Sequence, residues 1–75
     1  MPEFSLTIRM PIGNDHDNMT KLLAIVRRPA RSIGTSGING VETFNVLFVF
    51  ATEAERDEVK ANVEAKHPDF ECEVT

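Results

Sequence analysis

Large apolar residues occupy every second position in two stretches of the 75-residue chain. In Phe4–Met10 the even-numbered residues are Phe, Leu, Ile and Met, and in Thr43–Phe50 they are Phe, Val, Phe and Phe. Successive side chains of a strand point to opposite faces, so each stretch predicts a strand with one buried face. Pro11 ends the first strand. A shorter alternation over Phe70–Val74 predicts a last strand, in which Cys72 points inward as a small buried residue.

A different spacing follows the first strand. Apolar residues recur there at i, i+3, i+4 and i+7, namely at Met19, Leu22, Leu23 and Val26. This spacing predicts an amphipathic helix. We expect Asn14–Asn18 to supply its N-cap and first turn, and Pro29 to stop it after two arginines that complement the helix dipole.

The second predicted helix begins almost directly after the strand Thr43–Phe50. Thr52 and Glu55 have the spacing of a capping box, in which the Thr hydroxyl and the Glu carboxylate each accept a hydrogen bond from a backbone N–H of the first turn. The helix is expected from Glu53 to about Lys66, with a thin apolar face built on Val59 and Val63. Pro68 follows its end.

Between the first helix and the long strand lies a segment with few apolar residues, Arg31–Ile38. It is compatible with an edge strand. Asn39-Gly40 after it is the typical pair of a two-residue type I′ hairpin turn, because both central positions need positive φ. The hairpin would place Ile33 beside Val46, on the core side of the sheet.

The elements together predict one domain over residues 1–75 with the order βαββαβ. This is the ferredoxin-like α+β fold, a two-layer sandwich whose antiparallel sheet has the strand order 4-1-3-2 and both helices on one face. The core-facing set is expected to be Leu6, Ile8, Leu22, Leu23, Val26, Phe44, Val46, Phe48, Phe50, Val59, Val63 and Phe70.

The other face of such a sheet would be open. Our candidate partner surface on it consists of Thr7, Arg9, Asn45, Leu47 and Val49. A domain of this size buries only roughly 60% of the surface that its unfolded chain exposes, and its two edge strands offer unpaired backbone groups. We therefore expect a non-enzymatic protein-interaction module that associates with itself through the sheet face or an edge. Such a chain suits a regulator, an assembly factor or an inhibitor of a larger protein.

The net charge of −4 is unevenly distributed. Residues up to Gly40 carry a net +2, and the rest of the chain carries −6. The alternative function is binding of a nucleic acid or another polyanion by a basic patch at the end of the first helix, because arginine pairs with phosphate. Its candidate residues are Lys21, Arg27, Arg28 and Arg31.

The stretch Phe48–Glu55 resembles the third strand and second helix of RNA-recognition-motif domains. That family stacks bases on aromatic side chains of the open sheet face. The corresponding outward positions here are Thr43, Asn45 and Leu47, and the chain has no Tyr or Trp. Base stacking on the sheet is therefore not expected.

A third hypothesis is a small-ligand sensor with a contact loop between the second and third predicted strands along the chain. Its candidate residues are Gly34, Gly37, Asn39 and Gly40, which let another backbone or a ligand approach closely. The loop matches neither the dinucleotide fingerprint nor the P-loop, since it precedes a strand and no Lys follows. This hypothesis rests on analogy between folds.

No residues are nominated for catalysis, for a metal or for a cofactor. Asn14–Asn18 gathers oxygen and nitrogen ligands, but Met19 occupies the third ligand position of a calcium loop and no Glu follows at the required spacing. No nucleophile and base are paired by sequence, so we expect the chain not to be an enzyme.

Cys72 is the sole cysteine, which suits a reducing compartment. The N-terminus lacks the basic start and apolar core of a signal peptide, and no apolar run approaches the ~20 residues that cross a bilayer. We expect a cytoplasmic protein with no membrane partner.

Overall fold

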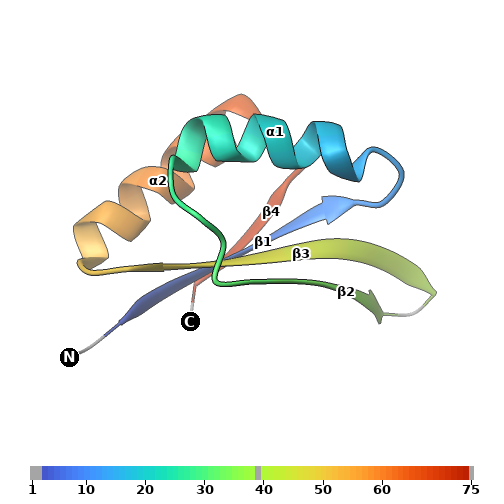
Figure 1. Ribbon diagram of the computed structural model, residues 1–75, viewed down its shortest axis with the longest axis horizontal. Helices are drawn as coiled ribbons and strands as arrows, with labels where there is room; N and C mark the ends of the chain where they lie inside the picture. The colour runs from blue at the N-terminus through green and yellow to red at the C-terminus, as the bar shows by residue number, and fades with distance from the viewer. Residues whose placement is uncertain (1–2, 39, 75) are drawn as a thin grey trace.

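The computed structural model describes residues 3–38 and 40–74. Its elements follow the predicted order and are β1 (Phe4–Pro11), α1 (Asp15–Val26), β2 (Ser32–Ile38), β3 (Val41–Phe50), α2 (Glu53–Lys66) and β4 (Glu71–Val74). The described strands form a four-stranded antiparallel sheet of order β2-β3-β1-β4, which is the predicted order read from its other edge. Both described helices lie on one face of this sheet (Figure 1). The ferredoxin-like α+β fold is thus confirmed.

The register of the central strands explains how the core forms. Leu6 is opposite Phe48 and Ile8 is opposite Val46, so the even-numbered residues of β1 and β3 share the face beneath the helices. The buried core consists of Leu6, Ile8, Met10, Leu22, Val26, Val46, Phe48, Phe50, Val63 and Phe70. Phe44 and Val59, also predicted to face the core, are partly buried against it.

The prediction for Leu23 was wrong. This side chain is 39% exposed, while Leu22 and Val26 are buried and Met19 is partly buried. Each helical residue is rotated by about 100° from the one before it, which takes Leu23 out of the buried stripe of α1. Ile25 packs against the core on the opposite flank of Leu22 instead.

Ile33 lies opposite Val46, as predicted, but it is 55% exposed rather than part of the core. The helices pack against β1, β3 and β4, and they leave β2 at the rim of the sandwich. Figure 1 shows the end of β2 and the start of β3 extending past α1. The core side of a sheet is therefore buried only as far as the helices reach.

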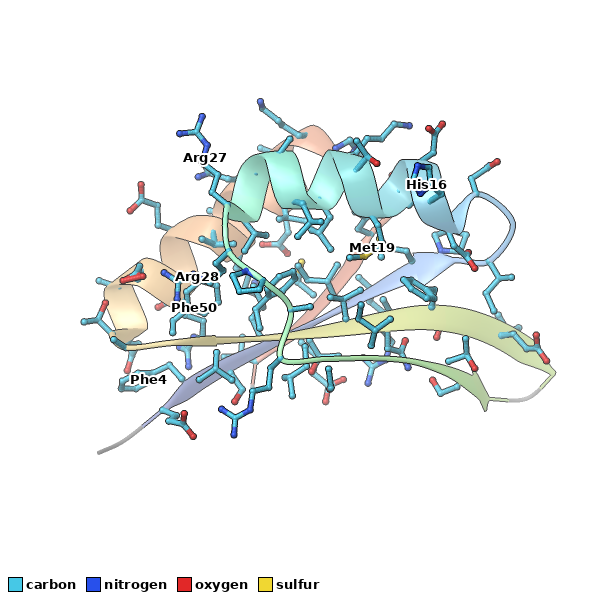
Figure 2. The ribbon with its side chains drawn as sticks, viewed as in Figure 1. Phe4, His16, Met19, Arg27, Arg28 and Phe50 are labelled. Carbon is cyan, nitrogen blue, oxygen red and sulfur yellow. The ribbon has the colours of Figure 1, made fainter. Side chains whose placement is uncertain are left out.

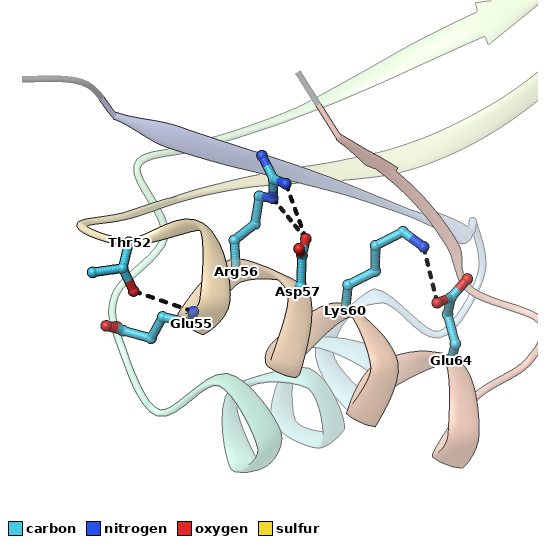
Figure 3. Close-up of polar contacts among 6 residues, drawn as sticks. All are labelled: Thr52, Glu55, Arg56, Asp57, Lys60 and Glu64. Atoms are coloured by element: carbon cyan, nitrogen blue, oxygen red, sulfur yellow. Dashed lines mark hydrogen bonds and ion pairs between the residues drawn. The ribbon is translucent and has the colours of Figure 1, made fainter.

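The junction of β3 and α2 contains half of the predicted capping box. Thr52 is the N-cap, and its hydroxyl accepts a hydrogen bond from the Glu55 N–H at 3.2 Å (Figure 3). The reciprocal half was wrong, since the Glu55 carboxylate pairs with Arg28. Arg56–Asp57 and Lys60–Glu64 form further ion pairs along α2 (Figure 3).

The ends of α1 differ from the prediction in detail. Within the described residues, the Asn14 side chain caps no backbone N–H of α1, and Asp15 instead accepts from the Gly13 N–H at 3.3 Å. The helix ends because Arg27 adopts a left-handed conformation with φ 58° and donates its N–H to the Leu23 carbonyl. The predicted Asn39-Gly40 turn falls in part outside the described residues, and Gly40 has φ 80°.

Candidate interaction surface

The face of the sheet opposite the helices, here called the open face, carries the odd-numbered residues of β1 and β3. Thr7 lies opposite Leu47 and Arg9 lies opposite Asn45, while Val49 lies opposite Ser5. The structure therefore brings the five candidate partner-surface residues together on one face. Figure 1 shows this face free of helices.

The apolar part of the open face is distributed differently from the prediction. Leu47 and Val49 are half-buried by neighbouring side chains, whereas Val41 is 64% exposed. Val41 has the odd parity of the open face, but the sequence places the start of the strand at Thr43, so this residue was missed. The signal was present, because a β-branched residue precedes Thr43 by two positions.

A closed polar network lies on the same face. Thr43 Oγ1 donates to Asn45 Oδ1 at 2.9 Å, and Asn45 Nδ2 donates to Ser36 Oγ at 2.6 Å. The Ser36 and Thr43 hydroxyls are 3.4 Å apart. The network joins β2 to β3 and fixes the orientation of the Asn45 amide.

Arg9 occupies the centre of the charged part of the open face. It forms an ion pair with Glu73 of β4 and lines a shallow hollow of about 360 Å³ together with Val41, Thr43, Glu71 and Glu73. Arg9 Nε is buried and meets no hydrogen-bond acceptor among the described residues. An unpaired buried donor is costly, because it loses its hydrogen bonds to water and gains none in the protein.

The strand β2 forms the rim beside this face. Within Ser32–Gly37, Ser36 is half-buried and the other side chains are exposed. Of the candidate contact loop, Gly34 and Gly37 lie within β2, Gly40 lies in the connection to β3, and Asn39 is outside the described residues. The candidate residues thus lie on an edge strand more than in a loop.

The structure separates the four candidate polyanion residues. Arg31 pairs with Glu3, and Arg28 pairs with Glu55. Lys21 and Arg27 are exposed and pair with no carboxylate of the described residues. Arg27 lines a hollow of about 400 Å³ with Asn62 and Lys66, a cation of α2 that sequence reasoning did not associate with the patch.

Arg28 connects three parts of the fold. Its Nη1 donates to the Val49 carbonyl at 3.0 Å, its Nη2 pairs with Glu55, and its guanidinium carbon lies 4.4 Å from the centre of the Phe50 ring. In Figure 2 Arg27 projects away from the sheet, whereas Arg28 lies on the helix side of the sheet beside Phe50. Arg28 is therefore positioned to hold the end of α1 against the β3–α2 junction.

Cys72 lies on the core side of β4 and is half-buried. Burial raises the pKa of its thiol, the Glu64 carboxylate raises it further, and Lys60 opposes the shift. A raised pKa lowers the thiolate fraction at neutral pH, which makes this thiol a poor nucleophile.

The described residues offer neither a cluster of metal ligands nor a helix that could cross a membrane. Among residues 3–38 and 40–74, His, Cys, Asp and Glu side chains form no group of three that could hold a metal ion. Neither described helix combines the length and the apolar character that a bilayer crossing requires.

Comparison with known proteins identifies the fold alone. No protein-family model matches the sequence, and no curated protein matches it. The solved structures that resemble it include the de novo designed protein Foldit4, with 15% sequence identity and a TM-score of 0.58 over 99% of this chain and 94% of that one. The crystal structure of protein Atu4242 from Agrobacterium tumefaciens is similar at 12% identity and a TM-score of 0.51, over 99% and 91% of the two chains. At such identities the likeness carries no function.

Proposed function

We propose that this chain is a non-enzymatic protein-interaction module. It associates with itself through the sheet face or an edge, and it binds a larger protein through the open face. In this role it would serve as a regulator, an assembly factor or an inhibitor. The observation that carries the proposal is the one-sided sandwich. Both described helices cover one face of the sheet, and the opposite face and the strand β2 remain uncovered.

Two features of the open face favour a protein as the partner. Exposed Val41 lines a hollow with Arg9 and Glu73, and Glu73 and half-buried Leu47 lie on either side of Thr7. Apolar and charged groups therefore adjoin one another on this face. Protein interfaces combine such an apolar centre with a polar rim. A polyanion would meet Glu71 and Glu73 on this face, and their charge would repel it.

The partner surface is tested by a matched pair of Leu→Glu variants. Leu47→Glu changes the open face, and Leu23→Glu changes an exposed position on α1. We expect a tagged wild-type chain and the Leu23→Glu variant to retain the same partner from the native cell, and the Leu47→Glu variant to lose it. Circular dichroism of both variants checks that they fold. Equal retention by both would contradict the open face as the partner surface.

Self-association is tested separately by light scattering over a concentration series at low and high salt. We expect a rise toward twice the monomer mass that persists at high salt, because the contacts involve backbone and apolar groups more than free charges. A chain that stays monomeric at every concentration would contradict this part of the proposal.

A further inference from the structure

We infer that two copies of this chain pair through their β2 strands, antiparallel about a two-fold axis at Thr35, into one continuous eight-stranded sheet. This inference rests on the proposed self-association and names its interface. A two-fold axis perpendicular to the sheet keeps all helices on one side and joins the two open faces on the other. The partner-binding surface would thereby double.

The two edges of the sheet differ in their fitness for such pairing. Native proteins protect exposed edges with charges, with Pro and by keeping the strand short. The edge strand β4 is four residues long and carries Glu71 and Glu73, so self-pairing would bring carboxylates close together. The edge strand β2 has seven residues, Ser32–Ile38, and none of them is charged or Pro. It lacks the protection that β4 has.

Charge also limits which surface can meet its own copy. The chain carries a net charge of −4, so two copies repel one another over most orientations. A contact through β2 brings uncharged strands together and keeps the acidic strand β4 at the two far ends of the joined sheet. The second copy is therefore the occupant that this neutral edge suits.

The glycines of β2 have no explanation within one copy. Neither Gly34 nor Gly37 has a positive φ, and a Cβ added at Gly34 would meet nothing within 4 Å. A Cβ added at Gly37 would make ordinary contacts at 3.7 Å or more with Glu42 and Val41. Glycine weakens a strand interior and often marks a place where another backbone approaches closely.

Pairing about Thr35 would explain why glycine occupies positions 34 and 37. In this register Ile33 is opposite Gly37 of the second copy, and Ser36 is opposite Gly34, so each glycine of β2 faces a larger residue. Thr35 is the central residue of β2, and the register therefore pairs the whole strand. The exposed Ile33 side chain gains a neighbour on the helix side of the sheet.

The register is tested by charge changes at Thr35, which faces its own copy across the axis. Thr35→Lys places two ammonium groups opposite one another, and Thr35→Glu places two carboxylates. Thr20 is an exposed threonine on the helix α1, so Thr20→Lys and Thr20→Glu are controls with the same change in net charge. Dissociation constants are measured by sedimentation velocity, and circular dichroism checks the fold of each variant.

We expect each Thr35 variant alone to raise the dimer Kd roughly tenfold or more, because like charges juxtaposed across an interface are costly. An equimolar mixture of Thr35→Lys and Thr35→Glu should restore dimers, and the Thr20 variants should match the wild type. If the wild type dimerises and the Thr35 variants keep its Kd, or their mixture stays monomeric, this inference is overturned while self-association stands. A wild type that never dimerises overturns both.

Discussion

Phe48 and Leu47 are neighbours in β3, yet their side chains have opposite environments. Phe48 is fully buried beneath the helices, and Leu47 is half-buried on the open face. Phe48→Ala should lower the free energy of unfolding by about 3–5 kcal/mol through lost burial and a cavity. Leu47→Ala should cost about 1 kcal/mol, since much of its surface already meets water. Urea denaturation of both variants measures the contrast, and equal losses would mean that the open face is covered within one copy.

The two arginines at the end of α1 should also behave differently. Arg28 bonds the Val49 carbonyl, pairs with Glu55 and lies over Phe50, while Arg27 is exposed. We expect Arg28→Ala to lower the free energy of unfolding by about 2 kcal/mol. Arg27→Ala should change it by less than about 0.5 kcal/mol. Thermal unfolding of the two variants measures the difference. Equal losses of stability would contradict the role of Arg28 in holding the end of α1 against the β3–α2 junction.

At the scale of elements, the two helices begin in different ways. The Thr52 hydroxyl caps α2, but within the described residues the Asn14 side chain caps no N–H of α1. Thr52→Ala should therefore cost about 1 kcal/mol, and Asn14→Ala should have little effect. Guanidinium denaturation compares them. A larger loss from Asn14→Ala would show that the cap at α1 has been misidentified.

The sequence predicts the elements of this fold because periodicity and helix-end signals are local. The alternation places β1 to within one residue and the end of β3 at Phe50, although β3 begins two residues before the predicted Thr43. A proline follows the end of each described helix by two or three residues. The exposure of Ile33 was not predictable, because it depends on how far the helices extend across the sheet. The exposure of Leu23 depends on which flank of Leu22 faces the sheet, and the structure places Ile25 there instead. The partner of Glu55 was equally hidden, since Arg28 is distant from it in sequence.

In the candidate partner surface, too, local sequence predicts some features and the fold decides others. Alternation alone places Thr7, Arg9, Asn45, Leu47 and Val49 on one face, and the register confirms that they share it. The sequence could not show that Arg9 pairs with Glu73. Nor could it show that Arg28 and Arg31, predicted to form a basic patch, each pair with a carboxylate distant in sequence. These pairs join residues that only the folded chain brings together.

At the scale of the whole molecule, the sandwich is asymmetric in both cover and charge. The helices protect one face, the acidic strand β4 forms one edge, and the uncharged strand β2 forms the other. A monomer with this arrangement exposes backbone groups along β2 that a second copy would pair. Association through β2 is therefore the central proposal that this arrangement supports.

The most direct test is a series of ¹H–¹⁵N correlation spectra recorded from dilute to concentrated wild-type protein. Self-association through β2 predicts concentration-dependent shifts at the amides of Ser32–Gly37 and their neighbours in β3, with the outer surfaces of α1 and α2 unchanged. Spectra that do not change with concentration, or that change at the helices and not at β2, would contradict this account.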